Sequence, residues 1–114
     1  MLHMISSFDL RQDANLERFY HAVTELYSHL IHVGLLVSVG PICQRFADTP
    51  MDTDEIRPHG LLFTTTFRDQ AQCDQAYDYI AAKGSKAARL HAQMMACVAD
   101  NAVFSCWREM DSLC

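Results

Sequence analysis

The chain has 114 residues, half of them hydrophobic, and a formal net charge of -5. This length suits one domain over residues 1–114, and the hydrophobic content excludes intrinsic disorder. The acidic balance argues against nucleic acid as a partner, because binding phosphates takes clustered basic residues, and the one basic cluster (Lys83, Lys86 and Arg89) is typical of a solvated helix face.

The chain begins with a predicted strand and a long predicted helix. Residues 2–9 are partly β-branched and bounded by turn formers, which indicates a strand. Residues 13–34 predict a helix of about five turns, with Asp13 or Asn15 as its cap and Gly34 at its end. Its apolar stripe consists of Leu16, Phe19, Tyr20, Val23, Leu26, Tyr27, Leu30 and Ile31.

A second strand is predicted over residues 35–46. Gly40-Pro41 must break or kink it, because proline donates no ladder hydrogen bond, and an edge strand tolerates this best. The connector over residues 47–60 then carries four carboxylates, but it lacks the later glycine and glutamate of a calcium loop. We expect a surface excursion at the sheet edge, near a pocket mouth or a partner subunit, which Met51 and Ile56 pin down.

The second half of the chain predicts a strand, two helices and a last strand, over residues 60–67, 69–82, 86–99 and 102–110. Asp69 can cap the first of these helices, Gly84 can end it, and Ser85 can cap the second. The stripe of the first helix consists of Cys73, Ala76, Tyr77 and Ile80.

The predicted element order is β-α-β-β-α-α-β, and it contains a weak internal repeat. SSFDLRQDANLERFY and TTFRDQAQCDQAY both run from a strand ending in phenylalanine, through an aspartate, into a helix. Two βαβ halves with right-handed crossovers make a ferredoxin-like α+β sandwich. The sequence therefore predicts a four-stranded antiparallel sheet with helices on one face.

Both faces of that sheet carry apolar side chains, although an antiparallel sheet with one wet face should alternate cleanly. In the third strand Leu62 lies opposite Leu61, Phe63 and Phe67. In the last strand Val103 and Trp107 lie opposite Phe104, Cys106 and Met110. The helices cover one face, so we expect a homodimer that buries the other face.

The element order, the length and the two-sided sheet resemble the dimeric α+β barrel superfamily. MISSFDL, GPICQRFADTPMDTD, FRDQAQCDQAY and FSCWREM are also similar to a bacterial family of uncharacterised proteins with that fold. The resemblance spans nearly the whole chain and implies two subunits packed sheet to sheet, with a ligand pocket between the sheet and helices of each. The superfamily includes cofactor-independent monooxygenases, haem-degrading monooxygenases, isomerases, dehalogenase-like enzymes and small-molecule sensors.

Two functional classes stay open. One is an enzyme that acts on a small aromatic or quinone-like compound, such as a cofactor-independent monooxygenase, and the other is a non-catalytic binding or accessory protein. An oxygenase of this kind needs an apolar pocket and few polar anchors, because the reduced substrate activates oxygen. The candidate ligand-binding residues are Tyr20, Tyr77, His91, Trp107 and Arg108. The alternative for the tyrosines is an amphipathic position at the edge of the core.

No cofactor is expected. The haem-degrading members resemble one another in an asparagine on the first strand, a tryptophan on the third and a histidine ligand on a helix. Here the first strand carries Ser6 and Ser7, and the single tryptophan, Trp107, is on the last strand.

No metal site is expected either. On the first helix, His21 and His29 lie roughly 12 Å apart, too far to share an ion, so any set is limited to Glu25, His29 and His32. A solvated helix face explains these residues better. On the last helix, His91, Met94 and Cys97 have the spacing of soft copper ligands, but such residues are more often core filler.

The cysteines indicate a reducing compartment. Their number is odd, no C-x-x-C pair occurs, and they are Cys43, Cys73, Cys97, Cys106 and Cys114. This is neither a disulfide framework nor a zinc knuckle. The N-terminal stretch MLHMISSFDL lacks the features of a signal peptide, and no apolar run approaches the roughly 20 residues that span a bilayer. We expect a cytoplasmic protein with reduced thiols and no membrane partner.

Overall fold

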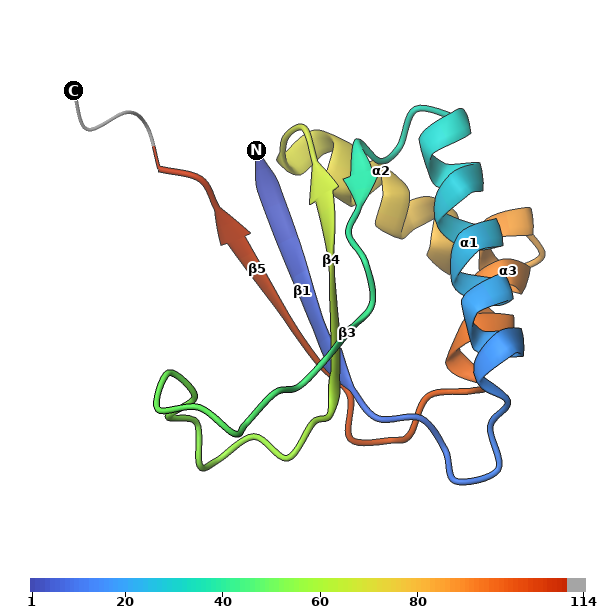
Figure 1. Cartoon of the computed structure of the whole chain (residues 1–114). Coiled ribbons are helices and arrows are strands. Elements are labelled where there is room, and N and C mark those ends of the chain that lie inside the picture. The colour runs from blue at the N-terminus through green and yellow to red at the C-terminus, as the bar shows by residue number, and fades with distance from the viewer. Residues whose placement is uncertain (111–114) are drawn as a thin grey trace.

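The computed structural model describes residues 1–110, and Cys114 therefore lies outside the described residues. An antiparallel sheet carries three helices on one face, as Figure 1 shows. The elements are β1 (Leu2–Phe8), α1 (Leu16–His32), β2 (Ser38–Val39), β3 (Cys43–Gln44), β4 (Leu61–Phe67), α2 (Gln70–Ala81), α3 (Lys86–Met95) and β5 (Val103–Arg108). This arrangement is the predicted ferredoxin-like α+β sandwich.

The sheet has the order β2-β4-β1-β5, and β3 also pairs with β4. Ser6, in the middle of the sheet, pairs with Phe63 on one side and with Phe104 on the other. The predicted second strand is two short strands, β2 and β3, on either side of Gly40-Pro41. Both lie at the sheet edge, so the predicted break and the predicted edge position are confirmed.

The helices begin and end at the residues that their capping chemistry favours. Each begins after a side-chain oxygen that accepts a hydrogen bond from the backbone N–H three residues on, and these caps are Asn15, Asp69 and Ser85. Asn15, and not Asp13, caps α1. Gly34 and Gly84 adopt φ of +79° and +84°, where glycine is favoured. Within residues 1–110, no helix is long and apolar enough to cross a membrane.

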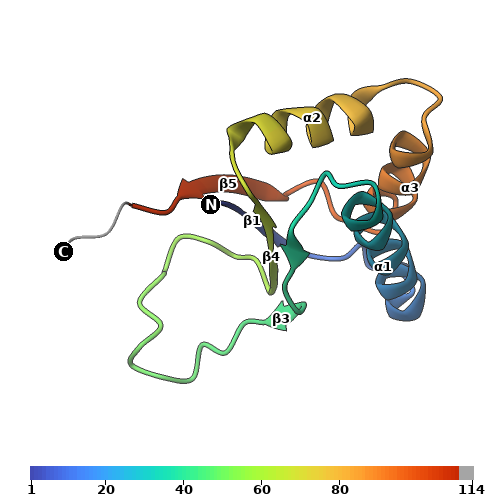
Figure 2. The ribbon, with the colours of Figure 1, turned by 90° about the horizontal axis from the view of Figure 1, so that it is seen from above.

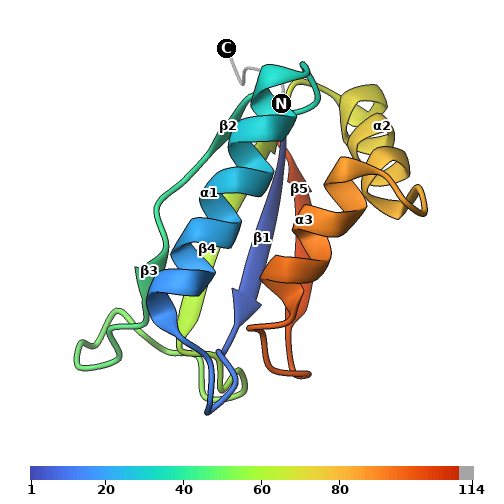
Figure 3. The same cartoon turned by 90° about the vertical axis from the view of Figure 1, so that its right-hand side faces the viewer.

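The core lies between the sheet and the helices, with α1 and α3 side by side (Figure 3). Its main members are Phe8, Phe19, Leu26, Leu30, Phe63, Phe67, Leu90 and Met94. The margins of the predicted stripe on α1 were wrong, since Leu16, Tyr20 and Ile31 are 52%, 46% and 41% exposed. These positions lie at the sides of the helix, which no other element within residues 1–110 covers.

Helix α2 meets the core through most of its predicted stripe, because Ala76 is buried and Cys73 and Ile80 pack against the core, but Tyr77 was predicted wrongly. Its buried residues are Gln72 and Ala76, whereas Tyr77 is 69% exposed. Gln72 tolerates burial because its side chain accepts from the Arg68 N–H at 2.6 Å and donates to the Gly34 carbonyl at 3.0 Å. A buried polar side chain thus took the place that the pattern assigned to tyrosine.

The face of the sheet without helices is named the open face, and the segment over residues 45–60 that extends from it is named the arm (Figure 2). Strand register assigns His3, Ile5, Ser7, Leu62, Thr64, Thr66, Val103, Ser105 and Trp107 to the open face. Leu62, Val103 and Trp107 are 38%, 48% and 60% exposed. The predicted apolar character of both faces is therefore present in the fold.

Candidate functional site

The helix face of the sheet carries two hydroxyl groups that are buried without a hydrogen-bond partner. Ser6 and Thr65 are 2% and 0% exposed, and within residues 1–110 neither hydroxyl has a partner. Leaving a buried polar group unpaired costs about 1–3 kcal/mol, so such groups in a folded protein need an explanation. Contact with a ligand is one such explanation.

The helices leave the β5 side of this face accessible. Phe104 shares the helix face with its cross-strand neighbour Ser6, yet it is 52% exposed. Cys106, one pleat further along, is exposed as well. At the end of β5, Arg108 donates to the Gln70 side-chain oxygen of α2 at 3.3 Å. Phe104 is therefore an exposed neighbour of the buried Ser6 on this face.

Aromatic rings line the interior behind Ser6. The ring of Phe8 lies 5.4 Å from that of Phe19 and 5.7 Å from that of Phe63, between centroids. Tyr27 contacts Phe63 at 5.5 Å, and burial raises the pKa of the Tyr27 hydroxyl, which keeps it protonated. The neighbours of Ser6 on this face, Phe8, Phe63 and Phe104, are thus aromatic and uncharged.

Three of the predicted ligand residues lie in the helix layer. Tyr20 and Tyr77 point largely to solvent from α1 and α2. His91 of α3 is half-buried, and desolvation lowers its pKa, which favours the neutral imidazole. Of these three side chains, His91 has the surroundings most suited to an uncharged ligand.

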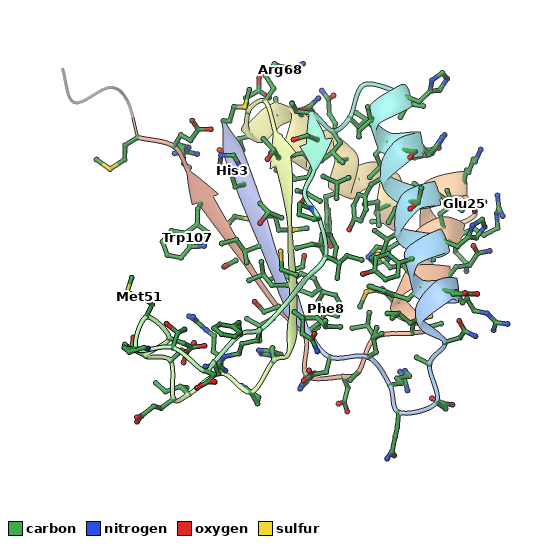
Figure 4. The ribbon with its side chains drawn as sticks, in the orientation of Figure 1. His3, Phe8, Glu25, Met51, Arg68 and Trp107 are labelled. Carbon is green, nitrogen blue, oxygen red and sulfur yellow. The ribbon has the colours of Figure 1, made fainter. Side chains whose placement is uncertain are left out.

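Trp107 and Arg108 lie on opposite faces of β5, because consecutive residues of a strand alternate. Trp107 is on the open face, where its indole N–H donates to the Ser105 hydroxyl at 2.9 Å. Figure 4 shows Trp107 on the side of the sheet away from the helices, and Phe8 next to the core. One subunit does not bring Trp107 and Arg108 into the same pocket.

The structure does not gather either of the histidine sets that were weighed as metal ligands and not predicted as sites. His21 pairs with Glu25 at 3.1 Å, and the His29 ring nitrogen meets the Tyr79 hydroxyl at 2.7 Å. Met94 and Cys97 are buried members of the core. Across residues 1–110, no three His, Cys, Asp or Glu side chains converge on one point.

A single arginine organises the arm. Arg45 donates twice to Asp52, at 2.9 and 2.8 Å, and also to the backbone carbonyls of Asp54 and Arg57. Asp54 accepts from the backbone N–H groups of Ile56 and Arg57, at 3.0 and 3.1 Å. These contacts, named the Arg45 clasp, close the arm on itself and place a guanidinium where a cation would have to bind.

Within one subunit, the clasp holds the arm in place and Met51 and Ile56 do not. Met51 and Ile56 are 89% and 92% exposed, and polar contacts hold the segment instead. Hydrogen bonds from Arg45 lower the pKa of Asp52, and those from the backbone of Arg57 and Ile56 lower the pKa of Asp54. One arginine just ahead of four carboxylates was the sequence signal for this clasp.

The antiparallel sheet with helices on one face defines this chain as an α+β protein of the ferredoxin-like fold. It belongs to a family of unknown function, DUF6614, whose model matches residues 1–111. The ferredoxin-like fold that the resemblance implied, and the resemblance to an uncharacterised family, are confirmed. No curated protein matches the sequence.

Three solved structures illustrate the shared fold. A protein of Arabidopsis thaliana is similar with a TM-score of 0.71 and 9% identity, covering 98% of both chains. SnoaB, a cofactor-independent oxygenase from Streptomyces nogalater, has a TM-score of 0.67 and 8% identity, covering 98% of this chain and 95% of its own. A dimeric ferredoxin-like protein of unknown function from Jannaschia sp. CCS1 has a TM-score of 0.64 and 16% identity, covering 95% of this chain and 98% of its own. Identities this low show the fold alone.

Proposed function

We propose that the protein is a homodimer in which each subunit binds a small aromatic or quinone-like molecule between its sheet and its helices, and oxygenates that molecule without a cofactor. The observation that carries the proposal is the pair of unpartnered hydroxyls of Ser6 and Thr65 on the helix face. The likeness to SnoaB supports the reaction class only through the shared fold.

The open face supports the dimer. Ile5, Leu62, Val103 and Trp107 form an apolar stretch there, and the arm adds Phe46, Met51 and Ile56, which are 69%, 89% and 92% exposed. Contiguous exposed apolar surface of this kind marks an interaction site. A second copy offers the same surface, so a two-fold pairing of open faces buries both.

The ligand site is proposed on the accessible part of the helix face, beside β5. The ligand ring would stack in the aromatic surroundings of Phe104 and Phe63, and its polar group would meet the Ser6 hydroxyl. His91 and Arg108 are proposed as further polar contacts from the helix side, with Tyr20 and Tyr77 at the rim. Trp107 is proposed to contact the ligand only if the partner subunit brings it there.

A specific observation favours the alternative of a non-catalytic binding or accessory protein. The largest fully buried side chains, Phe19, Leu26, Leu30 and Thr65, fill the space between the sheet and the helices. A layer filled by its own side chains has less room for a substrate. An accessory protein would instead use the open face and the arm.

Oxygen uptake with a reduced aromatic substrate separates the two functions. With anthrone as the probe and chelator present, oxygenation converts the ring CH2 to C=O, so one oxygen atom enters the product and the other leaves as water. We expect enzyme-dependent uptake of one O2 per ketone formed, reduced in Ser6→Ala and unchanged in the surface control Gln93→Ala. Binding of anthrone without uptake would support the non-catalytic alternative, and an absence of both would contradict the ligand site.

A further inference from the structure

A hollow of ≈ 320 Å³ lies where the arm leaves the sheet, away from the helices. Its lining includes Ser7, Cys43 and Leu62 from the strands, together with His59 and the two arginines of the arm. Pockets that hold small molecules begin at about this volume. Ser7 and Leu62 belong to the open face, so the hollow is separate from the ligand site proposed on the helix face.

His59 is one of the residues that line this hollow, and its side chain carries an unused hydrogen-bond acceptor. The residue is 8% exposed, and its Nε2 lies 2.6 Å from the Asn101 carbonyl oxygen. A carbonyl oxygen only accepts, so Nε2 carries the proton, and in the neutral ring Nδ1 keeps its lone pair. Within residues 1–110, Nδ1 is buried without a partner.

The backbone around His59 is held at three strand ends, which fixes the position of the ring. Asp9, just after β1, accepts from the Gly60 N–H at 2.8 Å. The other Asp9 oxygen accepts from the Asn101 side chain at 3.0 Å, just before β5. The Nδ1 acceptor is therefore preorganised, and a ligand that uses it pays little entropy to order it.

The charges around the hollow balance, which argues against an anionic ligand. Arg45 is paired with Asp52 by two hydrogen bonds, and Arg57 lies 3.3 Å from Asp54. Leu61 and Leu62 contribute apolar wall, and Ser7 contributes a hydroxyl. The chemistry of the lining suits a neutral molecule with an apolar body and one donor group.

We propose that this hollow is a second binding site, which takes a small neutral molecule carrying a hydroxyl on an apolar ring. The ligand hydroxyl donates to His59 Nδ1, and the ring lies against Leu62. The proposal does not depend on the ligand site of the helix face, because the two sites share no residue. It does share Leu62 and the arm with the proposed dimer face, so it requires that the paired open faces leave the hollow open.

Phenol and anisole test the site as a matched pair of probes, because anisole replaces the donating hydroxyl of phenol with a methyl ether. In nitrogen-15 NMR titrations of the whole protein, we expect phenol to shift the amides of Gly60 and Leu62. One neutral hydrogen bond corresponds to about fivefold in affinity, so anisole should bind about fivefold more weakly. His59→Gln keeps an N–H toward the Asn101 carbonyl and removes Nδ1. It should weaken phenol about fivefold and leave anisole unchanged.

The ring nitrogens of wild-type His59 give a readout that does not depend on a variant that folds. We expect the Nε2-protonated tautomer, with an Nδ1 resonance that moves toward the hydrogen-bonded range as phenol is added. Ser6→Ala should leave these shifts unchanged, which separates this site from the helix-face site. Three outcomes would each overturn the proposal. Phenol and anisole could bind equally, the shifts could be confined to the helix face, or phenol could shift nothing because a second copy's arm already fills the hollow.

Discussion

The two faces of the sheet differ in what covers them, although the same strands build both. Phe63 and Leu62 are neighbours on β4, yet Phe63 is 3% exposed on the helix face and Leu62 is 38% exposed on the open face. Strand alternation places apolar residues on both sides. The difference therefore comes from the helices of the chain itself, which cover one side only.

The polar groups of the two faces differ in the opposite sense. On the open face, the two ring nitrogens of His3 meet the Thr66 hydroxyl at 2.9 Å and the Glu109 carboxylate at 2.8 Å. On the helix face, the hydroxyls of Ser6 and Thr65 have no hydrogen-bond partner in the described part of the chain. The open face thus has satisfied polar groups and uncovered apolar ones, which suits a protein partner. The helix face has the reverse, which suits a ligand with a polar group.

The largest expected effect comes from a charge at the centre of the open face. Ile5 lies on the central strand between Thr64 and Ser105. If two open faces pack together, Ile5→Lys places an unpaired charge in the interface of each subunit, and a buried unpaired charge costs about 3–5 kcal/mol. We expect a monomer or insoluble protein, as measured by size-exclusion chromatography with light scattering.

Gln93→Lys is the matched control for this variant, because it adds the same charge on an exposed position of α3. It should leave the dimer intact. A wild-type protein that is monomeric at micromolar concentration would contradict the dimer itself.

The second prediction makes the same substitution, threonine to valine, on the two opposite faces of β4. Thr65→Val removes a buried hydroxyl that has no partner, so it should raise the free energy of unfolding by about 1 kcal/mol, roughly 4 °C in Tm. Thr66→Val removes the hydroxyl that His3 contacts, so it should lower stability by a similar amount. Thermal unfolding of both variants measures this. A loss of stability in Thr65→Val as well would show that the Thr65 hydroxyl has a partner in solution.

Much of the fold was predictable because its signals are local. Asp69, Gly84 and Ser85 mark helix ends by capping chemistry that depends on a few neighbouring residues, and Gly40-Pro41 marks the break in the edge strand by its missing donor. Tyr77 shows the limit of this approach. Its place in a helical stripe looked like core, but the face that α2 buries was decided by tertiary contacts of Gln72.

The candidate site was less predictable because its features depend on distant pairs. His59 and Asn101 are 42 residues apart, and no spacing rule links them. Ser6 and Thr65 became notable only when the register showed both to be buried and unpaired. The contacts of Arg45 were easier to predict from the sequence, since all of its partners follow within twelve residues. The positions of Tyr20, Tyr77, His91, Trp107 and Arg108 are now known, and their role as ligand residues stays a prediction.

A smaller effect is expected when the pH is lowered, because the arm on the open side is held by polar contacts of Asp52 and Asp54 and not by apolar ones. The pKa values of Asp52 and Asp54 lie below their ordinary 3.8 in the folded protein. Their ionised forms therefore stabilise the folded arm above pH 3.8, and this stabilisation is lost as the pH falls through the lowered values. We expect the amides of Ile56 and Arg57 to stay protected from hydrogen exchange at neutral pH and to lose protection below pH 3.8.

Asp52→Asn should loosen the arm at neutral pH, whereas Asp48→Asn should not, because Asp48 takes no part in the Arg45 clasp. Calcium or zinc should not increase protection or Tm, since the guanidinium already occupies the carboxylates. Stabilisation by either metal through this segment would show that the carboxylates form a site.

The smallest expected effect is that of a reductant on stability, which should be none. The four cysteines within the described residues are free: Cys43 and Cys106 are exposed, Cys73 is partly buried, and Cys97 is buried. Burial raises the pKa of the Cys73 thiol, which lowers its thiolate fraction and its reactivity. Cys97 contributes as a small apolar side chain, because it packs in the core beside Met94 and Val98.

Adding a reductant should leave Tm unchanged, and a thiol reagent should label Cys106 in the native protein but Cys97 only after unfolding. A Tm that falls by several degrees on reduction would mean that a disulfide supports one of the two faces.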